Sequence, residues 1–257
     1  MYLTWLDSNS WLIELAGQRI LLDPWLVGPL VFGNLSWFFK AEHQTPRAIP
    51  EHIDLILLSQ GLPDHAHPET LKSLDHRIPV VGSASAAQVV QKLGYPQVTT
   101  LQPGDQVQVG PLHIQAFPGA PIGPLVVENA YVLTDLSTQT RLYYEPHGFH
   151  SSTLQEIGSV DVVIAPLVDL QLPLVGPFIK GGEKALEVVQ WLQPQVVVPT
   201  TAGGEVTYQG LLNAILRAKG SVDDFRTLLT QHHCPAQVMA LSPGERTEVK
   251  LANPVTP

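Results

Sequence analysis

The chain has 257 residues, of which 44% are hydrophobic and 14% charged, so it can bury on the order of 70–75% of its unfolded surface. The 14 Lys and Arg residues against 23 Asp and Glu give a net charge of −9; because no basic run is present, we expect no nucleic-acid partner. The single cysteine, Cys234, excludes an internal disulfide and a cysteine-based zinc cluster. Without a signal-type start or an apolar run of about 18 residues, a cytoplasmic protein with no stable membrane insertion is expected.

The first 60 residues predict an antiparallel meander followed by a buried strand. Residues 2–6, 10–15 and 18–22 are β-rich runs separated by short turns. Residues 25–39 contain five aromatic and no charged side chains, but glycine and proline interrupt them, so no helix is expected there. The continuous apolar run at 54–58 is typical of a strand covered on both faces.

The rest of the chain predicts α/β alternation, a second meander and a second α/β stretch. Helices are expected at 68–74, 85–93, 152–158, 183–192, 207–219 and 222–231. Strands are expected at 78–81, 98–101, 106–109, 111–117, 127–135, 141–144, 161–165, 195–199, 236–241 and 246–251. Since no low-complexity linker separates the halves, we predict one domain over residues 1–257, with two facing sheets and helices outside them.

Chemically useful side chains gather in the loop after the buried strand. Asp64 offers a carboxylate, and His65 and His67 offer neutral imidazoles, which are common ligands of divalent metals. The alternative is that Asp64 caps the helix beginning near Pro68 and that the two histidines face solvent. The sequence alone leaves both interpretations open.

A second group follows the strand that closes the second meander. Glu145, His147 and His150 again combine a carboxylate with two imidazoles at a strand end. The alternative is a turn made by Pro146 and Gly148, with His147 hydrogen-bonded to the backbone and the other two side chains solvated. Either interpretation fits this segment by itself.

Several short sequence motifs occur in the same order as in one known family. They are Trp5 to Trp11, Ile20 to Pro24, Leu57-Leu58-Ser59 before Asp64-His65, Phe117-Pro118-Gly119, Tyr143-Tyr144, Gly181 to Ala185, Val196 to Pro199 and Ser242 to Glu245. Over nearly its whole length the chain resembles the metallo-β-lactamase fold superfamily, and within it the hydrolases related to ascorbate-6-phosphate lactonase. The resemblance implies an α/β fold, a four-layer αββα sandwich with its site at one edge between the sheets.

The same resemblance implies an altered metal site. The family motif His-x-His-x-Asp-His falls on residues 60–65, where Gln60 and Leu62 occupy the histidine places and only the final Asp64-His65 pair is kept. The next family histidine falls near Ala120, and the last falls on Thr200 or Thr201. The bridging carboxylate falls near His147. The resemblance therefore implies the loss of the first metal site.

The remaining Asp64, His65 and His147 form a chemically coherent set. Two imidazoles and one carboxylate can hold one zinc, iron or manganese ion and leave positions for water or substrate. Such a site would hydrolyse an ester, lactone or phosphoester, with Asp64 and His65 as catalytic residues. His67, Glu145 and His150 are candidates to orient the ligands or to replace them. The alternative is that no metal binds and Asp64 and His65 form a hydrogen-bonded pair.

The uncharged stretch Trp25–Phe39 follows Asp23-Pro24, which in this family leads into loops beside the site. Trp37 and Phe38 are candidates to line a substrate pocket for a small molecule. Core or dimer packing is the plainer interpretation. In the alternative function, a non-catalytic relative binds a ligand or protein partner through the former active-site cleft and this loop. Residues 167–179 are expected to form a second rim loop, and the oligomeric state is left open.

Overall fold

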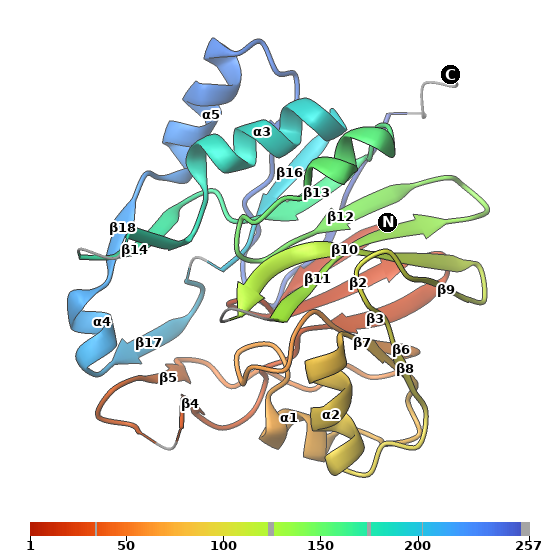
Figure 1. The fold of residues 1–257 in the computed structure, drawn as a ribbon, viewed down its shortest axis with the longest axis vertical. Coiled ribbons are helices and arrows are strands. Elements are labelled where there is room, and N and C mark those ends of the chain that lie inside the picture. The colour runs from red at the N-terminus through yellow and green to blue at the C-terminus, as the bar shows by residue number, and fades with distance from the viewer. Residues whose placement is uncertain (34, 123–125, 174–175, 202, 253–257) are drawn as a thin grey trace.

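Two facing seven-stranded sheets form the centre of the protein (Figure 1). The computed structural model describes residues 1–257 apart from 34, 123–125, 174–175, 202 and 253–257. The first sheet has the order β20 (Arg246–Glu248), β1 (Tyr2–Trp5), β2 (Trp11–Leu15), β3 (Gln18–Leu22), β6 (Leu55–Leu58), β7 (Val80–Gly82) and β8 (Val98–Thr100). Its β1–β2–β3 meander is antiparallel, and β3, β6, β7 and β8 are parallel.

The second sheet repeats this plan with longer central strands. Its order is β19 (Gln237–Val238), β16 (Val196–Pro199), β13 (Val162–Ala165), β12 (Arg141–Tyr144), β11 (Val126–Asp135), β10 (Leu112–Ile122) and β9 (Gln106–Val109). The β9–β10–β11–β12 meander is antiparallel, whereas β12, β13, β16 and β19 are parallel. The last two strands of the chain, β19 in this sheet and β20 in the first sheet, are shorter than the predicted strands 236–241 and 246–251.

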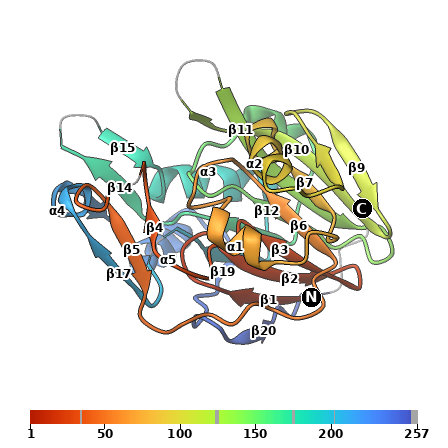
Figure 2. The same ribbon diagram turned by 90° about the horizontal axis from the view of Figure 1, so that it is seen from below.

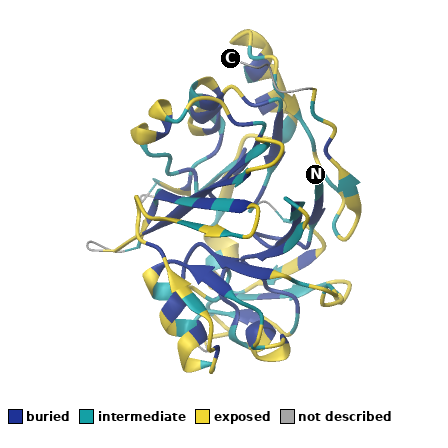
Figure 3. Cartoon of the chain, turned by 90° about the vertical axis from the view of Figure 1, so that its right-hand side faces the viewer, coloured by how far each residue is buried: buried dark blue, intermediate teal, exposed yellow. Residues whose placement is uncertain are grey.

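Helices cover the outer face of each sheet. α1 (Pro68–Ser73) and α2 (Ala84–Lys92) lie on the first sheet, and η1 (Ser152–Glu156), α3 (Gly182–Leu192) and α5 (Val222–Gln231) lie on the second. In β2, Trp11 and Ile13 pack between the sheets, whereas Leu12 packs toward α1 and α2, as the two-residue period of a strand requires. Figure 3 shows this buried interior between the layers. The predicted four-layer αββα sandwich is confirmed; the prediction of one domain stays a prediction.

Two small sheets flank the sandwich, at one side of the view in Figure 2. They are β17 (Val206–Gln209), β5 (Lys40–His43) and β4 (Leu30–Val31), and β15 (Gly176–Ile179), β14 (Asp169–Leu172) and β18 (Arg217–Lys219). The helix predicted over 207–219 is wrong, because only α4 (Leu211–Ile215) is helical there. Gly210 has φ 100°, and residues on either side pair with β5 and β14, so tertiary pairing overrides the local preference. The rim loop predicted over 167–179 likewise contains two paired strands.

The carboxyl ends of β3, β6, β12 and β16 bring four loops to one edge between the sheets. β3 runs parallel to β6, and β12 and β16 both run parallel to β13, so the residues following these strands emerge together. A hydrogen bond from the Tyr144 hydroxyl to Asp23 Oδ2, 2.7 Å long, joins the two sheets there. Among the described residues, no helix is long and apolar enough to cross a membrane.

Candidate metal centre

Asp23, the residue after β3, is the buried anchor of this edge. Its Oδ1 accepts the Ser59 backbone N–H at 2.7 Å, and its Oδ2 accepts the hydroxyls of Ser59 at 2.5 Å and Tyr144 at 2.7 Å. Oδ2 also lies 2.7 Å from His65 Nδ1. Since Asp23 is fully buried, these donors provide the stabilisation that water gives to an exposed carboxylate.

The Asp23 contact determines how His65 is oriented. Nδ1 donates to Asp23, so Nε2 faces the site, where Asp64 Oδ2 lies at 3.2 Å and the Asn9 amide nitrogen at 3.3 Å. Burial disfavours the charged imidazole, but the carboxylates of Asp64 and Asp23 outweigh it and raise the pKa of His65 to about 10. Asp64 favours a proton on Nε2, whereas the Asn9 nitrogen favours a lone pair there. The atom therefore suits a proton or a metal ion.

His147 approaches from the opposite sheet, on the loop after β12. Glu145 Oε2 accepts the backbone N–H groups of His147 at 3.0 Å, of Gly148, and of Phe149 at 2.9 Å, which gives the loop a defined shape. The ring centres of His147 and His65 lie 5.0 Å apart. Burial and the nearby charge of His65 lower the pKa of His147 to about 3. The imidazole is therefore neutral at physiological pH, the form that binds metals.

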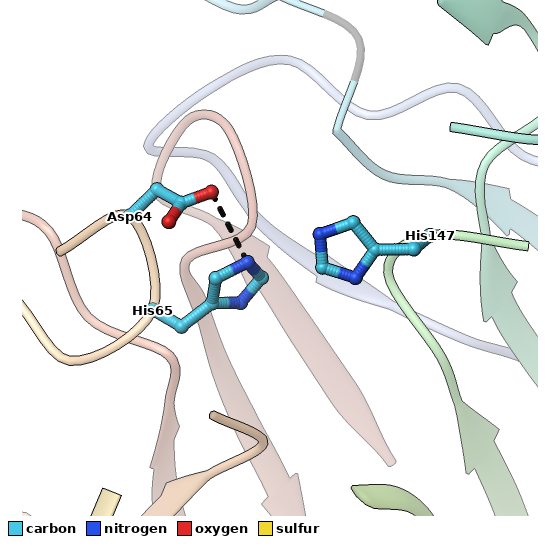
Figure 4. A group of neighbouring side chains, drawn as sticks. All are labelled: Asp64, His65 and His147. Carbon is cyan, nitrogen blue, oxygen red and sulfur yellow. Dashed lines mark ion pairs between the residues drawn. The ribbon is translucent and has the colours of Figure 1, made fainter. Parts of the chain in front are cut away.

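Asp64, His65 and His147 converge on one point between the sheets (Figure 4). Their ligand atoms all lie within 4.8 Å of one another. Burial disfavours the Asp64 carboxylate, but the charge and hydrogen bond of His65 outweigh it and lower the pKa of Asp64. Among the described residues, its buried Oδ1 has no hydrogen-bond partner. Ligands about 2.1 Å from one tetrahedral ion lie roughly 3.4 Å apart, so the widest separation would close by up to about 1.4 Å. The donor set fits a single divalent ion.

The other predicted site residues lie around this cluster or away from it. His67, rather than Asp64, caps α1, because its Nδ1 accepts the Thr70 N–H at 3.3 Å. Glu145 supports the His147 loop, and its Oε1 lies 4.0 Å from His147 Nδ1. His150 Nδ1 lies 3.0 Å from the Tyr143 hydroxyl. The roles of these three side chains at a metal stay predictions.

Trp37 and Phe38, the predicted pocket residues, lie in the segment between β4 and β5. Their rings pack edge to face with centres 6.0 Å apart. Phe38 packs against the small cluster around Trp25, whereas Trp37 is 65% exposed. The His65 and His147 rings pair with each other, whereas Trp37 and Phe38 pair with each other and Phe38 joins the Trp25 cluster.

At the positions where the resemblance implies a histidine, other side chains are present and make other contacts. Gln60 Nε2 lies 3.3 Å from His147 Nε2, and Leu62 is 40% exposed. Ala120 is buried in β10, and the Thr201 hydroxyl lies 2.8 Å from Asn9 Oδ1. None of these four side chains supplies an imidazole, so they leave Asp64, His65 and His147 as the donor set.

Asp23 and Asn9 are site residues that the sequence reasoning missed. In the sequence, Asp23 was noted only as part of a motif shared with the family. Its position could have indicated a site residue, because Asp23 directly follows β3, and β3 pairs with the strand that precedes Asp64 and His65. Asn9 carries no such signal, because the β1–β2 turn reaches His65 and Thr201 only through the tertiary structure.

His150 predicts a pH dependence of stability. Burial and the nearby Lys184 charge lower the pKa of His150 to about 3, whereas the unfolded imidazole titrates near 6.5. As the pH falls below about 6.5, the unfolded chain binds a proton that the folded chain does not, so stability falls. Replacing His150 by Gln should reduce the stability lost between pH 7 and pH 5 by about 2 kcal/mol at most. Urea unfolding at both pH values measures this; the exposed His52→Asn variant is the control, and an unchanged loss would contradict the prediction.

Comparison with known proteins places this arrangement in a family. The sequence matches the family described as the β-lactamase superfamily domain over residues 2–201. The chain belongs to the metallo-β-lactamase fold superfamily. In this superfamily member, the matched segment includes Asp23, Asp64, His65 and His147.

Relatives of this superfamily member are named as metal-dependent hydrolases. A UPF0173 metal-dependent hydrolase of Pyrobaculum arsenaticum is 25% identical over 209 residues, covering 77% of this chain and 83% of the relative. A second, of Hyperthermus butylicus, is 22% identical over 260 residues, covering 95% and 97%. The predicted metal-dependent hydrolase character is thus supported at the level of the family.

Solved structures with the same fold include two named hydrolases. The metallo hydrolase Igni18 of Ignicoccus hospitalis superposes with a TM-score of 0.68 at 18% identity, covering 97% of this chain and 99% of its own. An isothiocyanate hydrolase from Delia radicum gut bacteria gives 0.69 at 16% identity, with coverages of 97% and 99%. At these identities the likeness concerns the fold, since one fold hosts many chemistries.

Proposed function

We propose that the protein is a hydrolase that uses one divalent metal, zinc, iron or manganese, held by Asp64, His65 and His147. The observation that carries the proposal is the convergence of these three ligand atoms from both sheets within 4.8 Å. The names of the relatives support a metal-dependent hydrolase. The substrates proposed are small molecules with an ester, lactone or phosphoester bond, and the cytoplasmic location stays a prediction.

Each surrounding group has a defined task in this proposal. A divalent metal supplies Lewis acidity and lowers the pKa of a water that it binds toward about 7. Asp23 holds the proton on His65 Nδ1 and keeps Nε2 available. Glu145 fixes the loop that presents His147. The Asn9 amide, held by Thr201 at 2.8 Å, places a hydrogen-bond donor beside the site.

Elemental analysis of protein purified without a metal-binding tag tests the proposal. We expect about one equivalent of zinc, iron or manganese per chain, removed by a chelator and restored by adding the metal. Because an ion that binds only the folded chain stabilises it, the melting temperature should fall on chelation and recover on reloading. Metal-free protein whose melting temperature ignores all three ions would overturn the proposal.

A second candidate function is supported by the exposure of Trp37. In this alternative the protein is a non-catalytic relative, and the segment Trp25–Phe39 docks a ligand or protein partner beside the former active site. A tryptophan that is 65% exposed beside Phe38 is a typical binding anchor. Here Asp64 and His65 would serve only as a buried ion pair that supports their loop.

A further inference from the structure

A polar pocket lies next to the candidate metal centre, on the side of the second sheet. It has a volume of about 300 Å³ and lies between the end of β10, the loop after β12 and the start of α3. Its lining includes Gly148, Phe149, His150, Ser151, Lys180 and Lys184. No carboxylate is among the described residues that line it. In a chain with a net charge of −9, two lysines without an acid in one small pocket are unusual.

The pocket is joined to the metal centre through the backbone. The Lys180 N–H donates to the carbonyl oxygen of His147 at 2.8 Å. Gly148 adopts φ 77°, and a Cβ there would overlap the Lys180 carbonyl. This close approach needs glycine. Lys180 is therefore held at a defined position beside a candidate metal ligand. A molecule with one group at the metal centre would have a second group near Lys180.

The two ammonium groups differ in how free they are. Lys180 Nζ lies 4.1 Å from the centre of the Phe149 ring and has no carboxylate within 4.0 Å among the described residues. Lys184 Nζ pairs with Glu187 at 2.5 Å on the exposed face of α3. An anion entering the pocket would meet Lys180 directly, whereas it would compete with Glu187 for Lys184.

His150 adds a further donor to the wall of the pocket. The Tyr143 hydroxyl lies 3.0 Å from His150 Nδ1, and donating its one hydrogen there satisfies both groups. The neutral ring then carries its own hydrogen on Nε2. That atom is buried and has no partner among the described residues. An unpaired buried donor on a residue that shares the pocket lining with two lysines favours an acceptor-rich ligand.

We propose that this pocket binds an oxyanionic group of the substrate, a phosphate monoester or carboxylate, while the bond to be hydrolysed lies at the metal centre. Lys180 is the main contact, and Lys184 and Ser151 are further donors. The statement that the anion belongs to a substrate rests on the proposed hydrolase function. Anion binding by the pocket does not, so the two can be tested separately.

Inorganic phosphate added to chelator-treated, 15N-labelled protein tests the pocket without the metal. We expect saturable shifts of the Gly148, Phe149 and Lys180 amide signals. Lys180→Gln, which keeps the backbone contacts of residue 180, should weaken phosphate binding at least about tenfold, because it removes a charge-assisted contact. Lys184→Gln should have a smaller effect, and the exposed Lys250→Gln variant should behave as the parent. Absent shifts, or equal affinity in the parent and Lys180→Gln, would overturn the proposal.

A substrate comparison with the metal-loaded protein connects the pocket to hydrolysis. We expect p-nitrophenyl hemisuccinate to be preferred over neutral p-nitrophenyl acetate, and Lys180→Gln to raise KM for the charged ester about tenfold with kcat unchanged. KM for the acetate should stay the same. Phosphate binding without hydrolysis of either ester would contradict the proposed function but support the anion pocket. Hydrolysis with no preference for the charged ester would contradict the substrate role of the pocket.

Discussion

Replacing Asp23 by asparagine should lower the free energy of unfolding by about 3–5 kcal/mol, the cost of breaking a buried charged network. Four donors converge on this carboxylate: the Ser59 N–H, the hydroxyls of Ser59 and Tyr144, and His65 Nδ1. The asparagine amide replaces one of the two acceptor oxygens with an NH2 donor, so at least one of the four donors would face another donor. The backbone itself tolerates the change, because asparagine, like aspartate, accepts the φ of 44° at this position.

The same substitution should weaken metal binding about 10- to 100-fold, since Asp23 holds the proton of His65 on Nδ1. Urea unfolding and a competition titration with a chromophoric zinc chelator measure the two effects. Asp54→Asn is the matched control: Asp54 is exposed and accepts the Arg19 N–H at 2.8 Å, so its loss should cost about 1 kcal/mol or less. An Asp23→Asn variant as stable as this control would contradict the network described here.

Removing metal ligands and removing the Trp37 and Phe38 rings should have opposite consequences under the two candidate functions. If the protein is the proposed hydrolase, Asp64→Asn and His147→Ala should each abolish the metal-dependent stabilisation and lower ester hydrolysis at least about a hundredfold. This loss exceeds the one expected from removing a residue that only orients a metal ligand. A Trp37→Ala, Phe38→Ala double variant should keep its metal. Metal content, melting temperature and hydrolysis of p-nitrophenyl esters are the measurements.

Complementation of cells lacking the gene separates the candidates further. The binding alternative expects Asp64→Ala, His65→Ala to keep function in cells and Trp37→Ala, Phe38→Ala to lose it, because the loop would carry the contact. The hydrolase expects loss of function from the first double variant. Leu211→Ala, a change at another exposed apolar side chain, controls for the general effect of removing surface apolar area.

The layered architecture follows from local pattern. The continuous burial of β6 and the nearly continuous burial of β2 indicate strands covered on both faces, because successive side chains of a strand point to opposite faces of the sheet. The error over 207–219 arose where that rule fails: apolar residues such as Leu211 and Ile215 have helical spacing but are exposed, and the flanking residues pair with β5 and β14. Strand pairing between distant segments leaves no periodic trace in either one.

The sequence alone determined the fold class and the side chains available for chemistry: one cysteine, and Asp64, His65 and His147 beside two strand ends. The tertiary structure decided how they are used. It brought His147 from the second sheet to Asp64 and His65, assigned His67 to the cap of α1, and placed Asp23 behind His65 and Lys180 beside His147. The physical reason is that local pattern records burial, whereas a site depends on strand ends from two sheets meeting at one edge.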